Sequence, residues 1–175
     1  MVCHRTLERE PDIICSSKAL ASGLPIGATI SKAKIMDWPG GSHASTFGGN
    51  PLSCVAAAAV IETIKEEKLL DNASKQGAYA LKRLSELKER SEIVGDVRGK
   101  GLMIGVELVE DKESKKPAVQ KAVQVITRAW KRGVAIVTCS ASTIRIAPPL
   151  TIQSEMLDAA LDIVEDTIDE VAKET

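Results

Sequence analysis

Residues 11–28 read PDIICSSKALASGLPIGA, and this stretch decides how the rest of the chain is interpreted. The apolar runs Ile13–Cys15 and Ile26–Ile30 predict two short buried strands, because Ser, Gly and Pro residues bound each of them. Between them lies a loop of small residues with one lysine, Lys18. A lysine in a polar loop is ordinarily a solvated side chain. The small residues after Lys18, however, leave room for a planar molecule to approach its amine, so Lys18 is a candidate for chemistry.

A helix is expected directly after the loop WPGGSHASTFGGN, residues 38–50. Asn50 is a preferred N-cap, and Pro51 suits the first helical position. We expect the helix to extend to about Lys68. Residues 55–61 are apolar around the whole circumference of this helix, which predicts that protein covers it on both sides.

The same loop has features of an anion-binding site. Gly48 and Gly49 let the backbone approach a ligand closely, and a helix N-terminus offers unpaired N–H groups and a positive dipole end. A capped helix entry explains Asn50 and Pro51 equally well. From the residues alone, both interpretations stay open.

The remainder of the chain alternates between helical and strand periodicity. Residues 69–90 have apolar side chains at helical spacing with charges between them, which predicts a surface helix. Further strands are expected at 93–97, 102–108, 134–137 and 143–146, and helices at 117–132 and 154–173, with Gly133 and Ser154 as caps. Residues 1–68 therefore look like a piece of a larger sheet domain, and residues 69–175 like a compact α+β domain.

Composition excludes several classes of protein. The formal net charge is -1 and aromatic residues make up 2% of the chain, so the basic stripe with stacking aromatics of a nucleic-acid-binding protein is missing. No apolar run approaches the roughly 18 residues of a membrane span, and the N-terminus does not resemble a secretory signal, so we expect a cytoplasmic location. The spacing of the four cysteines and two histidines fits neither a disulfide framework nor a metal site.

Four ordered motifs resemble one family. Residues 11–28 are very similar to the active-site segment of class III, fold-type-I aminotransferases. The matches continue with HASTFGGNPL at 43–52, VRGKGLM at 97–103 and RIAPPLT at 145–151. The resemblance implies an α/β fold that is the C-terminal part of a pyridoxal-phosphate (PLP)-dependent transferase. Residues 1–68 would be the remnant of its large PLP-binding domain, and residues 69–175 its small C-terminal α+β domain.

The resemblance also implies roles for three residues. Lys18 would form a Schiff base with PLP and then move a proton between the substrate carbon and the C4′ carbon of PLP. Thr46 would hydrogen-bond the PLP phosphate across a dimer interface. Arg145 would bind the substrate carboxylate, although an isolated arginine on a strand is more often an edge surface residue. Arg98 and Lys100 are expected to be structural turn residues.

The implied reaction is transfer of an amino group from 4-aminobutyrate or a similar ω-amino acid to a 2-oxo acid. Members of the family are more than twice as long, and most of their cofactor site precedes the lysine. We therefore expect a shortened chain that is inactive alone, and residues 2–10 fit the family poorly. The resemblance implies a homodimer. One alternative is a non-catalytic protein that pairs with a full-length aminotransferase. Another is a PLP-dependent aminomutase or racemase, although the residues after Lys18 look more like the transaminase branch.

Overall fold

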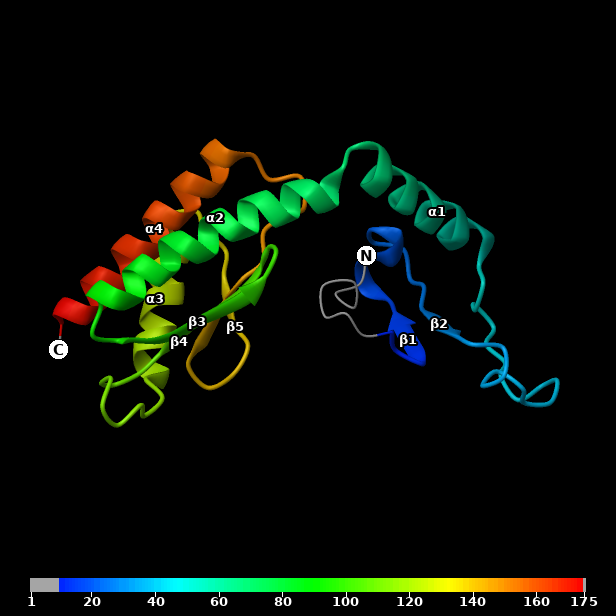
Figure 1. Ribbon diagram of the computed structural model, residues 1–175, viewed down its shortest axis with the longest axis horizontal. Coiled ribbons are helices and arrows are strands. Elements are labelled where there is room, and N and C mark those ends of the chain that lie inside the picture. Colours follow the sequence, from blue (N-terminus) through cyan, green and yellow to red (C-terminus); the bar gives the residue numbers. More distant parts are fainter. Residues whose placement is uncertain (1–9, 175) are drawn as a thin grey trace. The chain divides into compact units, whose positions relative to one another are not determined.

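The computed structural model describes residues 10–174, which form two compact units that divide between Leu69 and Leu70 (Figure 1). The segment that was expected to fit the family poorly is 2–10, and its residues 2–9 lie outside the described residues. In the described part, no helix is long and apolar enough to cross a membrane.

The first unit contains one antiparallel strand pair and one long helix. Its elements are β1 (Ile13–Ser16), the 3-10 helix η2 (Lys18–Ala21), β2 (Ala28–Ser31) and α1 (Pro51–Glu66). The prediction that both strands are buried is wrong, because Ile13 is 53% exposed and Ile30 is 57% exposed. Within residues 10–69 the sheet has only these two strands, so apolar side chains on them have little to pack against.

Helix α1 begins where the sequence predicts. The Asn50 side chain accepts hydrogen bonds from the N–H groups of Leu52 (3.0 Å) and Ser53 (3.3 Å), and Pro51 occupies the first turn. The helix packs against η2 and buries only Ser53 and Ala57. The expectation that protein covers both sides is therefore not met, since Val55 is 70% exposed.

The second unit is a four-stranded antiparallel sheet with three helices. Its helices are α2 (Leu69–Arg90), α3 (Val119–Lys131) and α4 (Ser154–Lys173). Its strands are β3 (Val94–Lys100), β4 (Met103–Leu108), β5 (Val137–Thr138) and β6 (Thr143–Ile146), in the spatial order β3-β4-β6-β5. Most of these bounds lie within two residues of the predicted ones.

The core of the second unit lies between one face of the sheet and the helices. Ile104, Val106 and Ile144 project from the sheet into a cluster with Leu84 of α2 and Leu161 of α4, and all five are at most 1% exposed. Full burial of one such aliphatic side chain contributes about 1.5–3 kcal/mol. The opposite face of the sheet carries polar residues and is open to solvent over much of its area.

Two local predictions fail in this unit. The strand expected at 134–137 is reduced to Val137–Thr138, because the N–H groups of Gly133 and Val134 bond to Trp130 O (3.0 Å) and Ala129 O (2.9 Å) and complete the end of α3. Gly133 has φ +90°, as the predicted cap requires.

Ser154 does not cap α4. Gln153 is the N-cap residue, and its side chain makes no capping hydrogen bond. The Ser154 hydroxyl instead accepts a 2.9 Å hydrogen bond from the Gln76 side chain, which links α4 to α2.

Candidate active site

Lys18 lies directly after β1 and is the first residue of η2. Its φ of +55° is in the left-handed region, which costs a residue with a side chain about 1–2 kcal/mol. Ser22 (φ +45°) and Gly23 (φ +113°) after η2 are also left-handed, so the whole loop is tightly turned. Backbone strain of this kind is concentrated at functional sites and motivates a functional hypothesis for this loop.

The Lys18 side chain is exposed and makes no hydrogen bond or ion pair within residues 10–174. Lys32, from the loop after β2, by contrast pairs with Asp12 at 3.7 Å. The Lys18 amine is therefore available to a ligand.

Thr46 lies in the tight turn before α1. This turn is closed by hydrogen bonds from Gly48 N–H to Ser45 O and from Asn50 N–H to Phe47 O, both 3.3 Å. A Cβ atom on Gly48 would lie 3.0 Å from the Ser45 Cβ, so the turn leaves little room for a side chain there. The Thr46 hydroxyl has no hydrogen-bond partner within residues 10–174 and can donate to an oxyanion.

The helix N-terminus itself does not offer the unpaired N–H groups that the sequence suggested. Leu52 and Ser53 donate to the Asn50 side chain, Cys54 N–H donates to Asn50 O at 3.0 Å, and Pro51 has no N–H. The first turn of α1 is thus satisfied internally. The Thr46 hydroxyl remains a donor that this segment can offer to an anion.

Arg145 lies on β6 between the buried residues Ile144 and Ile146, and its own side chain is exposed. It is paired with Gly105 of β4 on one side and Val137 of β5 on the other. The Arg145 side chain makes no hydrogen bond or ion pair within residues 10–174. Every other arginine of that range is paired with at least one carboxylate; these are Arg83, Arg90, Arg98, Arg128 and Arg132.

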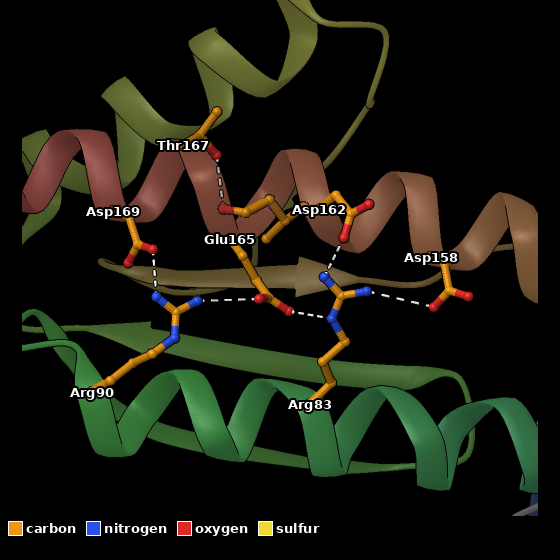
Figure 2. A network of polar contacts seen from close by, with 8 residues as sticks. Arg83, Arg90, Asp158, Asp162, Glu165, Thr167 and Asp169 are labelled. Carbon is orange, nitrogen blue, oxygen red and sulfur yellow. Dashed lines mark hydrogen bonds and ion pairs between the residues drawn. The ribbon is translucent and has the colours of Figure 1, made fainter.

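Figure 2 shows where two of the paired arginines lie. Arg83 of α2 contacts Asp158 (3.5 Å), Asp162 and Glu165 (2.7 Å) of α4. Burial alone would lower the pKa of Arg83, but hydrogen bonds to Asp162 and Glu165 outweigh it and raise that pKa. Arg90 contacts Glu165 as well, at 3.2 Å. These guanidiniums join α2 to α4, whereas Arg145 is the one in residues 10–174 that can receive an external carboxylate.

Two residues that were expected in a turn, Arg98 and Lys100, lie in β3 instead. Arg98 binds Asp96 at 2.9 Å and Glu107 of β4 at 2.6 Å. The signal was available, since the polar residues Asp96, Arg98 and Lys100 alternate with the spacing of a strand. Within residues 10–174, no group of three or more His, Cys, Asp or Glu side chains is arranged to hold a metal ion.

Comparison with known proteins connects these residues to a family. Residues 1–168 match the family described as Aminotransferase class-III. A leucine/methionine racemase of Thermococcus litoralis is 50% identical over 163 residues, which is 93% of this chain and 37% of that protein. A 4-aminobutyrate aminotransferase of Mycobacterium tuberculosis is 42% identical over 158 residues, which is 89% of this chain and 35% of that protein.

Solved structures show the same fold. An amine transaminase from an uncultivated Pseudomonas species, in its PLP-bound form, superposes with a TM-score of 0.88 at 33% identity and covers 95% of this chain and 40% of that chain. An ornithine delta-aminotransferase of Plasmodium falciparum gives a TM-score of 0.89 at 30% identity and covers 99% of this chain and 44% of that chain. The predicted α/β fold, the C-terminal part of a PLP-dependent transferase, is confirmed.

The comparisons leave the reaction open. The chain spans less than two fifths of the length of the curated relatives named above, and these relatives include both a racemase and an aminotransferase. The family match over residues 1–168 nevertheless covers almost the whole chain. The chain therefore belongs to the class-III aminotransferase family, whose members depend on pyridoxal phosphate.

Proposed function

We propose that this chain supplies Lys18, Thr46 and Arg145 to a PLP-dependent site that acts on amino acids. The observation that carries the proposal is the position of Lys18. Its amine has no partner within residues 10–174 and follows a strand in a left-handed conformation, inside a segment that resembles the family's active site. Lys18 and Thr46 belong to the first unit and Arg145 to the second, so their joint arrangement is part of the proposal.

The residues present fit the functional groups of PLP. PLP carries an aldehyde, which reacts with an unprotonated amine, and a phosphate, which needs hydrogen-bond donors. The available amine of Lys18 suits the first group, and the unpartnered hydroxyl of Thr46 suits the second. When bound, PLP supplies a conjugated ring that withdraws electrons from the substrate's amino-bearing carbon.

The protein residues then have separate tasks. Arg145 binds the substrate carboxylate through two parallel hydrogen bonds and thereby orients the amino end of the substrate. Lys18 removes the proton from the amino-bearing carbon and delivers it where the reaction requires. The Thr46 hydroxyl donates a hydrogen bond to a phosphate oxygen. In a dimer, this phosphate belongs to the cofactor in the site of the neighbouring subunit.

We propose amino transfer from 4-aminobutyrate or a similar ω-amino acid to a 2-oxo acid as the first reaction to test. Relatives that are 42% identical and named 4-aminobutyrate aminotransferase support this choice. Racemisation of an amino acid is the competing reaction, because the relative at 50% identity is named leucine/methionine racemase. The two reactions differ in where a proton would be returned after Lys18 has removed it: to the cofactor in amino transfer, or to the same substrate carbon, on the face opposite to the one it left, in racemisation.

The role of Lys18 can be tested by chemical trapping. The chain is mixed with PLP, the visible absorption band is recorded, and the adduct is reduced with borohydride and mapped by mass spectrometry. We expect Lys18→Ala to remove most of the reducible band and Lys34→Ala to leave it unchanged. Lys34 is a suitable control because it is also exposed and without an ion pair in residues 10–174. Equal loss in both variants would refute the role of Lys18.

The reaction type can be tested in parallel with two assays, one for each reaction. Formation of glutamate from 4-aminobutyrate and 2-oxoglutarate indicates amino transfer. Formation of deuterated D-leucine from L-leucine in D2O indicates racemisation. Either product must disappear in the Lys18→Ala variant if this chain carries the chemistry.

A second candidate function is that of a non-catalytic partner of a full-length aminotransferase. The observation that favours it is the exposure of three large apolar side chains at and after the turn that carries Thr46, namely Phe47 (79% exposed), Leu52 (75%) and Val55 (70%). Exposed apolar groups that are neighbours in space mark interaction surfaces, and Leu52 and Val55 lie three residues apart on one side of α1. We infer that this surface contacts a second subunit, either another copy or a full-length homologue.

Mixing experiments test this candidate. The chain is added to a full-length class-III aminotransferase whose own threonine matching Thr46 is replaced by valine. Restored activity would support pairing, and Val55→Glu should abolish the restoration. Val119→Glu is the control, because Val119 is an exposed apolar residue (44%) of the second unit. Restoration that resists Val55→Glu would exclude this surface.

A further inference from the structure

The outer face of the sheet in the second unit carries a defined set of charges. Residues that are directly paired across antiparallel strands lie on the same face. Asp96 pairs with Glu107, and Arg98 pairs with Gly105, between β3 and β4. Gly105 in turn pairs with Arg145 of β6. Asp96, Arg98, Glu107 and Arg145 therefore share this face.

Glu107 is the diagonal neighbour of two arginines. Because Gly105 is the direct partner of both Arg98 and Arg145, Glu107, two residues further along β4, is diagonal to each of them. Diagonal neighbours lie about 7–8 Å apart and are within reach of long side chains. Gly105 places no side chain between the two arginines. One carboxylate is thus positioned between two guanidiniums.

In the structure, Arg98 holds this carboxylate. Its Nη1 atom binds Glu107 Oε2 at 2.6 Å and Asp96 Oδ2 at 2.9 Å, and Lys88 adds a 3.3 Å contact to Asp96 Oδ1. Hydrogen bonds to Asp96 and then to Glu107 raise the pKa of Arg98, and the hydrogen bond from Arg98 lowers the pKa of Asp96. The two carboxylates directly opposite each other are compatible because Arg98 bridges them.

Loss of Arg98 would change the preferred partner of Glu107. Asp96 would then repel Glu107 from the β3 side. Arg145 would be the remaining guanidinium on this face, and within residues 10–174 it has no other partner. A long arginine and a glutamate can span a diagonal position, so Glu107 would be drawn to Arg145.

We propose that Arg98 is a positioning residue, which keeps Arg145 available to a substrate carboxylate by holding Glu107 on the β3 side. This inference rests on the proposed role of Arg145 in binding that carboxylate. It also explains why Glu107, the acidic residue nearest to Arg145 in the strand register, leaves Arg145 unpaired.

The test uses 2-oxoglutarate as the carboxylate probe. Binding to the whole chain is followed by NMR through the backbone amide resonances of β6, in the wild type and in the variants Arg98→Gln, Arg98→Gln/Glu107→Gln and Arg145→Gln. Arg98→Gln should weaken binding about fivefold, the size expected for competition by one exposed ion pair. The double variant should return to within about twofold of the wild type. Arg132→Gln, which removes an ion pair to Glu170 on α4, is the control and should not change binding.

Rescue by the second substitution separates positioning from a general structural effect. A damaged sheet would not be repaired by Glu107→Gln, so equal weakening in the single and double variants would overturn the proposal. Unchanged binding in Arg98→Gln would also overturn it.

A second readout does not need the ligand. In ligand-free Arg98→Gln the Arg145 Nε–H resonance should shift, and in the double variant it should return. Absence of this shift refutes the role of Arg98, whereas unchanged binding in Arg145→Gln refutes the proposed role of Arg145 instead.

Discussion

Single residues of the proposed site differ from their neighbours in the contacts they make. Lys32 pairs with Asp12, while Lys18 has no partner within residues 10–174. Arg83 contacts three carboxylates, while Arg145 contacts none within the same residues. A charged side chain that adds nothing to the stability of its own unit is free to serve a ligand.

This contrast predicts opposite effects on stability. Arg145→Gln should change the free energy of unfolding by less than about 0.5 kcal/mol, because the side chain is exposed and unpaired. Arg83→Gln should lower the free energy of unfolding by about 1–3 kcal/mol, because the substitution leaves the half-buried Glu165 without one of its two arginine partners. Urea unfolding monitored by circular dichroism measures both. A larger loss in Arg145→Gln than in Arg83→Gln would contradict the assignment.

Gly77 offers a second test at the residue scale. A Cβ atom at Gly77 of α2 would lie 2.3 Å from the carbonyl carbon and oxygen of Gly101, in the β3–β4 turn. Helix propensity alone favours alanine over glycine by about 1 kcal/mol. We nevertheless expect Gly77→Ala to destabilise by about 1–3 kcal/mol, because backbone on both sides must move. Ala78→Gly, at the exposed neighbouring position, should cost only the propensity difference; a stabilising Gly77→Ala would refute the close contact.

Local rules explain which residues could be assigned from the sequence. Asn50 caps α1 as predicted, because the cap and the groups it binds are adjacent in the chain. Ser154 fails as a cap, because Gln76, 78 residues away, bonds its hydroxyl. Arg98 was assigned to a turn for the same reason: its partner Glu107 becomes its neighbour only when β3 and β4 pair.

At the scale of elements, charged pairs supplement the apolar core in holding α4. Arg128 and Arg132 of α3 both contact Glu170 of α4, and Arg128 also contacts Glu174. The hydrogen bond from Arg132, followed by the effect of Arg128, lowers the pKa of Glu170. These pairs are solvent-exposed, so salt should weaken them.

This arrangement predicts how stability depends on pH. A glutamate whose pKa is lower in the folded than in the unfolded protein contributes stability above its unfolded pKa of about 4, and this contribution is lost as the pH falls through the folded pKa. Glu170→Gln should therefore flatten the decline of the urea midpoint between about pH 5 and pH 3. Glu155→Gln, on the same helix but without a partner in residues 10–174, is the control. A Glu155→Gln effect as large as that of Glu170→Gln would contradict this explanation.

The bounds of helices and strands were predicted most accurately where a regular apolar pattern extends over the whole element. The predicted bounds of α2, β6 and α4 agree with the structure, because each has a regular apolar stripe or a buried run. The prediction made strand β5 too long at its start. The N–H groups of Gly133 and Val134, which precede β5, hydrogen-bond to carbonyl groups at the end of α3 instead of joining the sheet. Burial of β1 and β2 was predicted from composition alone, and composition does not say whether a covering layer is present.

At the scale of the whole molecule, the two units differ in how well they bury their apolar residues. Within residues 70–174 the second unit encloses a continuous core of 23 buried residues, whereas in the first unit α1 buries only Ser53 and Ala57. The four motifs that resemble the family extend over both units. The family could therefore be inferred from sequence, whereas the difference in burial required the structure.

Unequal burial predicts unequal protection in hydrogen exchange. Amides of residues 55–66 in α1 should exchange faster than those of residues 158–171 in α4, because few buried apolar contacts oppose local opening of α1. Mass spectrometry of peptides from the whole chain resolves the two helices. Equal protection of α1 and α4 would show that α1 is stabilised by contacts that its exposed surface does not suggest.

Lys18 and Thr46 are the proposed PLP-binding residues of this chain, and phosphate-dependent labelling tests this proposal most directly. The ratio of borohydride-trapped label on Lys18 to that on Lys34 is measured with PLP, with pyridoxal, which lacks the phosphate, and with PLP on the Thr46→Val variant. We predict a high ratio with PLP on the wild type and a lower ratio in the other two experiments, because Thr46 is proposed to donate to the phosphate. A ratio that is the same in all three would contradict it, since Lys18 would then react only as an exposed amine.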